Sequence, residues 1–181
     1  MQENKDQGAD FIKIMISGLM DFDRFGVLTE EGLEPEEIRK LIHIVHEEGM
    51  AVAVHGNGTR NVLAAAEARV DSVEHGAYLD KDALQTMAEM GTVWVPTLST
   101  IGNLRGKGRF NEDAVRKILD SALENVRTFA SMGGLVAPGS DAGAWAVPHG
   151  SMTEEKLLEM ALGRDTAGVL EKGIQKIKEK F

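Results

Sequence analysis

The chain has no cysteine, few basic residues and no long apolar run. The absence of cysteine excludes disulfides and thiolate metal sites, and it fits a reducing compartment. Lysine and arginine total 20 against 29 aspartates and glutamates, a formal net charge of -9, which disfavours nucleic acid and anionic membranes as partners. No apolar run approaches the ~18 residues of a membrane span, and the polar start MQENKDQGAD is unlike a signal peptide. Together these features predict a cytoplasmic protein.

The order of apolar and amphipathic stretches predicts an α/β fold. The 181 residues suit one domain, residues 1–181, but fall short of the ~250 of a complete (β/α)8 barrel. Short β-branched runs alternate with amphipathic stretches, which is typical of βα units in a parallel sheet. We expect strands at residues 11–17, 51–55, 72–75, 92–97 and 135–139. We expect helices at residues 35–48, 80–91, 111–132 and 169–181. Two further helices are expected to begin at residue 59 and at a capping box formed by Ser151 and Glu154.

Three of these strands end in a side chain that can bind a metal ion. His55 is the last residue of the predicted strand in AVAVHGNG, and His75 is the last residue of the predicted strand in SVEHG. Asp141 follows the last predicted strand in LVAPGSDAG. Imidazole and carboxylate suit zinc and similar ions, and barrel enzymes place their sites at the carboxyl ends of strands. Alternation would put His55 with Ala53, and His75 with Val73, on the inner face of the sheet, where Asp141 also falls if its strand continues. The alternative is that these residues have structural roles only. The histidines would then belong to a hydrogen-bond network of loops, and Asp141 would be a turn residue.

Lys13 is a charged residue inside the apolar run FIKIMISG. Alternation groups it with Phe11 and Met15, facing the barrel lumen, where an unpaired ammonium is costly. A salt bridge to Asp141 or Glu74 would explain it, and so would a lysine whose charge has been chemically converted.

Other histidines and loops are weaker candidates. The spacing of His43 and His46 on one helix could suit a metal, but they lie off the apolar stripe, so we expect a solvated face. His149 is expected on a rim loop, either touching substrate or simply exposed. The segment from Ser99 to Arg109 is expected to form a flexible lid, since it lacks P-loop spacing.

Four motifs in order resemble the amidohydrolase superfamily, in particular its imidazolonepropionase-related and prolidase-like branch. FIKIMISG, VAVHGNG, SVEHG and GSDAG look like that family's lysine, two histidines and aspartate, and the match covers about residues 9–159. The resemblance implies a partial TIM (β/α)8 barrel whose five βα units correspond to strands 4 to 8. It also implies divalent metal, zinc above all, bound at the barrel mouth.

The resemblance also implies roles for individual residues. In binuclear members the lysine is carboxylated and bridges two ions, so Lys13 would carry a carbamate. His55 and His75 would bind one ion, and Asp141 the other while shuttling a proton. Hydroxide would then attack the carbonyl of an amide, and Asp141 would pass the proton to the leaving nitrogen.

The chain departs from the family pattern in three ways. It has no His-x-His pair, the motif with which the family's first strand supplies two further ligands. The first three strands of the barrel are accordingly missing, and so is the flanking segment that often forms a small β-sandwich. Asn57 stands where close relatives often have a second histidine, and we assign it and His149 to substrate contacts.

These observations give competing functions. The first is a metal-dependent hydrolase acting on an amide C–N bond of a small peptide-like, dipeptide-like or cyclic substrate, inactive as this fragment if the absent strand is essential. The second is a non-catalytic interaction fragment that pairs with another chain through its open barrel edges. A third is a barrel enzyme whose Lys13 forms a Schiff base with a carbonyl substrate. The unpaired edges of a partial barrel also favour pairing with another chain. We therefore expect either a homo-oligomer or a missing N-terminal half as the partner.

Overall fold

The computed structural model describes residues 2–143 and 146–181. Its centre is a parallel sheet of five strands in the order β1-β2-β3-β4-β5, so each βα unit adds a strand beside the previous one. The strands are β1 (Phe11–Met15), β2 (Ala51–Gly56), β3 (Ser72–His75), β4 (Val93–Val95) and β5 (Leu135–Val136). This arrangement confirms the predicted α/β partial barrel.

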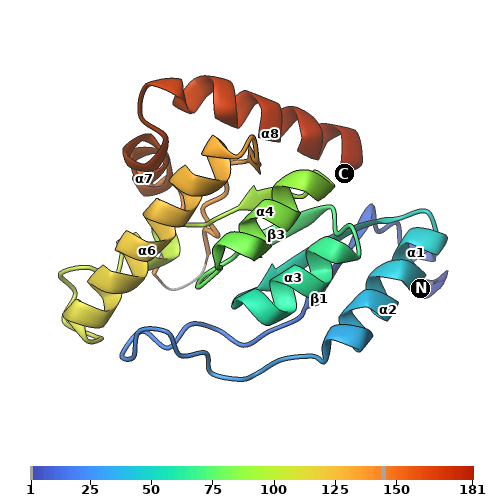
Figure 1. The fold of residues 1–181 in the computed structure, drawn as a ribbon, viewed down its shortest axis with the longest axis horizontal. Helices are drawn as coiled ribbons and strands as arrows, with labels where there is room; N and C mark the ends of the chain where they lie inside the picture. The colour runs from blue at the N-terminus through green and yellow to red at the C-terminus, as the bar shows by residue number, and fades with distance from the viewer. Residues whose placement is uncertain (1, 144–145) are drawn as a thin grey trace.

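One face of the sheet is covered by helices that follow the predicted βα pattern (Figure 1). They are α2 (Pro35–Glu47), α3 (Thr59–Glu67), α4 (Lys81–Met90) and α6 (Glu112–Ser131). Two further helices, α1 (Gln2–Asp6) and α5 (Ser99–Gly102), are short. The chain ends in α7 (Thr153–Leu162), a 3-10 turn (Gly163–Asp165) and α8 (Thr166–Lys180). In the part of the chain that the structure describes, no helix is long and apolar enough to cross a membrane.

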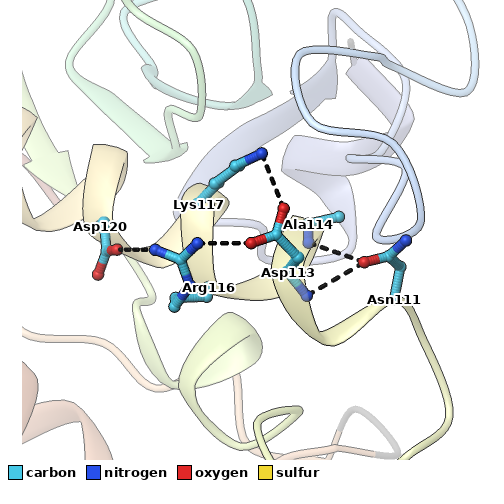
Figure 2. Close-up of polar contacts among 6 residues, drawn as sticks. All are labelled: Asn111, Asp113, Ala114, Arg116, Lys117 and Asp120. Carbon is cyan, nitrogen blue, oxygen red and sulfur yellow. Dashed lines mark hydrogen bonds and ion pairs between the residues drawn. The ribbon is translucent and has the colours of Figure 1, made fainter.

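Helix starts agree with the capping signals at two places. Asp80 caps α4 by accepting a hydrogen bond from the backbone N–H of Ala83, and Asn111 caps α6. Figure 2 shows this cap together with ion pairs along the first turns of α6. The predicted Ser151/Glu154 capping box is wrong, because α7 begins at Thr153 after Met152 without a side-chain cap. Glu154 instead accepts a hydrogen bond from the distant Ser99.

Strands β1, β4 and β5 are shorter than the sequence suggests, whereas β3 has the predicted bounds and β2 is one residue longer. Strand β1 ends at Met15, β4 ends at Val95 just before Pro96, and β5 has only two residues. Proline cannot donate to the ladder, which explains the end of β4. Because β5 stops at Val136, the strand geometry does not continue to Asp141.

The side of the sheet away from the helices is open. Phe11 and Met15 are 41% and 62% exposed, and Lys13 between them is also exposed. Ile16, on the opposite parity, is fully buried in the core. The predicted alternation of β1 is confirmed, but the predicted burial of Lys13 is wrong because no further strands cover this face in the part of the chain described.

Helix α8 partly shields the open face. It contacts β5 and β4, and its end reaches β1, where the rings of Phe181 and Phe11 meet edge to face at 4.9 Å. Lys180 lies 2.7 Å from the buried carboxylate of Asp71, which precedes β3. These contacts place α8 across the amino ends of the strands (Figure 1).

Candidate functional site

His55 lies at the carboxyl end of β2 in a buried position. The residue is only 4% exposed. Its Nε2 lies 3.3 Å from the carbonyl oxygen of Gly18, in the loop after β1. Burial lowers the pKa of His55, the contact with Gly18 opposes this shift, and the nearby charge of Lys13 adds to the lowering. The imidazole is therefore neutral at physiological pH, the form that binds metal.

His75 reaches the same place by a different backbone route. Register pairs His55 with Glu74, so Ser72 and Glu74 face inward while Val73 is fully buried toward the helices. The predicted grouping of His75 with an inward Val73 is therefore wrong. His75 has φ +70°, a left-handed conformation that breaks strand alternation and turns its side chain toward His55.

The two imidazoles form a close pair. Their ring centroids are 4.6 Å apart. His75 Nδ1 lies 2.7 Å from the hydroxyl of Thr97, and its carbonyl accepts a hydrogen bond from the indole of Trp94. Burial, followed by the charges of His55 and Lys13, lowers the pKa of His75 to about 3. Both rings are thus kept neutral side by side.

Asp141 lies at the same pocket, on the loop after β5. A pocket of about 210 Å³ is lined by both histidines, Asp141 and Asn57. Asp141 is exposed and has φ +55°. Its charge opposes the lowering of the pKa of His55, so the carboxylate acts electrostatically on that histidine.

Asn57 has a structural explanation as well as a place in this pocket. It is fully buried; its Nδ2 donates to the carbonyl of Gly18 at 3.1 Å, and its Oδ1 accepts from Ala77 N–H at 2.9 Å. These bonds tie the loops after β1 and β3 together around His55. A substrate contact would be an additional role.

Lys13 and His149 line neighbouring pockets. Lys13 and Glu74 border a pocket of about 460 Å³ between the inner face and α8. Lys13 lowers the pKa of both histidines, so the ammonium is electrostatically coupled to them. His149 is exposed and borders a third pocket, of about 700 Å³, which shares Ala146 and Val147 with the histidine pocket.

Other sequence expectations fare differently. His43 is exposed, as expected, whereas His46 is partly buried and lies 3.0 Å from the carboxylate of Asp71. The predicted lid is wrong in its first half, because Ser99 begins the helix α5 and Leu104 is buried in the core. Thr97 and Glu74 were not singled out as site residues. The sequence marks Glu74 only as a possible partner of Lys13, and no local signal marks Thr97.

The donor set suits a divalent metal ion in chemistry but is incomplete in number. Two neutral imidazoles and a rim carboxylate are the ligand types that zinc and related ions take. Among residues 2–143 and 146–181, however, no three histidine, aspartate or glutamate side chains are grouped closely enough to hold an ion. The described part of the chain therefore presents a partial metal site.

Comparison with known proteins decides the family. The model of the amidohydrolase family matches residues 1–174. The chain belongs to the amidohydrolase family. It is 26% identical over 175 residues to an ochratoxinase of Aspergillus niger, and 29% identical over 124 residues to an uncharacterised protein of Mycobacterium tuberculosis.

Solved structures agree with this family. The fold matches a Xaa-Pro dipeptidase crystallised with methionine in its active site, with TM-score 0.76 and 26% identity over 98% of this chain. It also matches the A. niger ochratoxinase structure, with TM-score 0.73, 23% identity and 99% coverage of this chain. The amidohydrolase chain spans 35% of the ochratoxinase sequence and 45% of the dipeptidase. It therefore corresponds to less than half of these two relatives.

Proposed function

We propose that this chain supplies the lysine, histidine and aspartate side of an amidohydrolase metal centre that hydrolyses an amide C–N bond. The observation that carries the proposal is the pair of neutral imidazoles of His55 and His75, 4.6 Å apart in a pocket shared with Asp141. The family match and the dipeptidase likeness support a small peptide-like or dipeptide-like substrate.

The proposed chemistry assigns a task to each residue. A bound divalent ion, zinc in our proposal, would lower the pKa of a water molecule and polarise the amide carbonyl. His55 and His75 would hold that ion. The Asp141 carboxylate would take the proton from the attacking water and deliver it to the leaving nitrogen. Lys13 would hold a second ion as a carbamate. The carbamate would form when the Lys13 side chain, exposed to solvent, loses a proton and the resulting neutral amine adds to carbon dioxide, releasing a second proton to water.

Completion of the centre requires ligands from outside the described residues. The chain holds no His-x-His pair and spans under half of the relatives compared. We propose that the remaining ligands come from a partner that completes the barrel, either an N-terminal half or another copy. Activity would then depend on that partner.

Metal binding tests this proposal. We expect protein purified without added metal, then incubated with Zn²⁺ and dialysed, to retain about one ion per chain by elemental analysis. In our proposal the ligands that a partner must supply belong to the other ion, whereas His55 and His75 lie on this chain. His55→Ala and His75→Ala should each lower the retained zinc at least about 10-fold, since each removes a direct ligand. His43→Ala is the matched control, because His43 is exposed on α2 and should not change it. Equal retention in all four proteins would refute the assignment.

The exposed inner face supports a second candidate function. Met15 and Phe11 are exposed on β1, and exposed apolar sheet surface favours docking of another chain. In this alternative the chain is a non-catalytic interaction fragment. It predicts no zinc retention in the parent protein but concentration-dependent association.

A further inference from the structure

Glu154 is a buried carboxylate whose placement the proposed chemistry does not use. It lies in the first turn of α7 and is only 1% exposed. Its Oε2 accepts a hydrogen bond from the backbone N–H of Ser99 at 2.6 Å. Its Oε1 has no hydrogen-bond partner within the described residues. A carboxyl group buried in this way costs free energy, which calls for a compensating role.

Ser99 connects Glu154 to the site. It is buried at the start of α5, directly after the segment that carries Thr97, the partner of His75. While its backbone donates to Glu154, its hydroxyl donates to the carbonyl oxygen of Ser140 at 2.8 Å. Ser140 immediately precedes Asp141. Two hydrogen bonds thus link α7, α5 and the loop that carries Asp141.

The loop at Asp141 needs such support. Strand β5 ends at Val136. Among the residues that the structure describes, the last hydrogen bond from this segment to β4 is donated by Ala137 N–H to the carbonyl oxygen of Trp94, so bonds to β4 do not hold Ser140 and Asp141. Asp141 has φ +55°, a conformation that persists in a non-glycine residue only when its surroundings impose it. The bond from Ser99 fixes the peptide unit just before this residue, which sets the direction in which the Asp141 side chain leaves the backbone.

Helix α5 also forms part of the pocket wall. Thr100 in α5 and Leu104, two residues beyond the end of this helix, line the pocket that holds both histidines and Asp141. The bond from Glu154 therefore anchors both this wall and, through Ser99, the loop opposite it. A glutamate or glutamine can supply this acceptor from α7, whereas an apolar side chain of similar size cannot.

We propose that Glu154 is a positioning residue that holds Asp141 at the rim of the metal site through Ser99. The inference rests on the proposed function for the catalytic role of Asp141. The effect of the Ser99 hydrogen bonds on the loop that carries Asp141 can be measured without metal. Supporting groups of this kind commonly change metal affinity 10–100-fold when removed.

The test uses two measurements on the whole chain. Hydrogen–deuterium exchange of the amides of residues 139–143 reports the loop in the absence of metal. Titration with Co²⁺, followed by its visible absorption, reports affinity at the site. We expect Ser99→Ala to speed exchange in this loop at least about 10-fold and to weaken Co²⁺ binding about 10–100-fold. Ser99→Ala keeps the backbone bond to Glu154, so α5 should stay docked.

Substitutions at position 154 separate positioning from general stability. Glu154→Gln keeps an oxygen acceptor for Ser99 N–H, and we expect exchange and Co²⁺ affinity within about threefold of the parent. Glu154→Ala should reproduce both defects of Ser99→Ala. Glu155→Ala, on the exposed side of α7, is the matched control and should change neither.

The outcomes distinguish the two proposals. Parental exchange and parental Co²⁺ affinity in Ser99→Ala would overturn the positioning role, whatever Glu154→Ala does. A Co²⁺ affinity that falls equally in Glu155→Ala would also overturn it. If the parent binds no Co²⁺, the proposed function fails, while faster loop exchange in Ser99→Ala and normal exchange in Glu154→Gln would still support the linkage.

Discussion

At the scale of single residues, two histidines with different backbone conformations form one site. His55 continues its strand, whereas His75 leaves its strand in a left-handed conformation with φ +70°. Such a conformation in a non-glycine residue costs about 1–3 kcal/mol. The bond from Trp94 to the His75 carbonyl and the bond between His75 and Thr97 offset that cost. The strain is therefore located at the residue that makes the imidazole pair.

Glu154 should give the protein a measurable dependence of stability on pH. Burial raises the pKa of Glu154 to about 7, although the hydrogen bond from the Ser99 backbone lowers it, and the charge of Glu155 raises it further. The folded chain therefore keeps a proton that the unfolded chain releases above a pKa of 4.5. Between these values, rising pH should reduce the free energy of unfolding by up to roughly 3 kcal/mol.

Glu154→Gln should remove this contribution because glutamine does not titrate. We expect the free energy of unfolding of the variant, relative to the parent, to increase from pH 4.5 to pH 7 and to level off above that range. Urea unfolding at several pH values measures this difference. The contribution of His75 to the pH dependence cancels, because His75 titrates in both proteins. A difference that does not change with pH would contradict the buried carboxyl. Glu159→Gln is the control, because Glu159 is exposed on the same helix.

At the scale of elements, α8 docks through a glycine. A Cβ at Gly173 would lie 2.0 Å from the carbonyl oxygen of Val136, so only glycine allows the helix to approach β5 this closely. At the far end of α8, Lys180 and Phe181 contact Asp71 and Phe11. The helix thus spans the amino ends of the sheet from its last strand to its first.

Gly173→Ala should therefore destabilise the protein although alanine favours helices. A backbone clash of this size cannot be relieved by a side-chain movement, and we expect a loss of about 1–3 kcal/mol, as for overpacked cores. Gly168→Ala lies in the same helix, where the nearest atom is a side-chain oxygen of Asp165 at 3.0 Å. That control should be neutral or stabilising by up to about 1 kcal/mol. Thermal unfolding of both variants checks the difference, and equal melting temperatures would contradict close docking.

At the scale of the whole molecule, the sheet is open at its β1 edge. Large apolar side chains are exposed on β1 and the loop after it, at Phe11, Met15, Leu19 and Phe25. Exposed apolar surface beside an unpaired strand favours association. The same edge is where a barrel-completing partner would add its strands.

The chain alone is therefore expected to self-associate. Sedimentation velocity over a range of concentrations should show a shift from monomer to dimer at micromolar concentration. Met15→Lys should weaken this association at least about 10-fold, because a charge at an edge strand opposes pairing. Met160→Lys is the matched control, since Met160 is 60% exposed on α7 and Met15 is 62% exposed on β1. A monomer at every concentration, or equal effects of both substitutions, would contradict association through this edge.

Local pattern was sufficient to predict much of this protein. The alternation of apolar runs with amphipathic stretches predicted five βα units, and the ordered motifs around Lys13, His55, His75 and Asp141 predicted the family. The βα pattern depends on residues that are close in the sequence. Each motif is a short segment at or near the end of one strand. The length of the chain also predicted that the barrel would be partial.

Tertiary structure decided what depends on contacts between distant segments. The left-handed turn at His75 is imposed by Trp94 and Thr97 from the next βα unit. The exposure of Lys13 follows from the open inner face, which alternation within β1 cannot reveal. The role of Glu154 arises from a bond to Ser99, 55 residues earlier, so a local capping pattern misassigned it. The sequence by itself determined which side chains have the chemistry of metal ligands, and only packing between distant segments decided that His55, His75 and Asp141 line one pocket while Lys13 lines another.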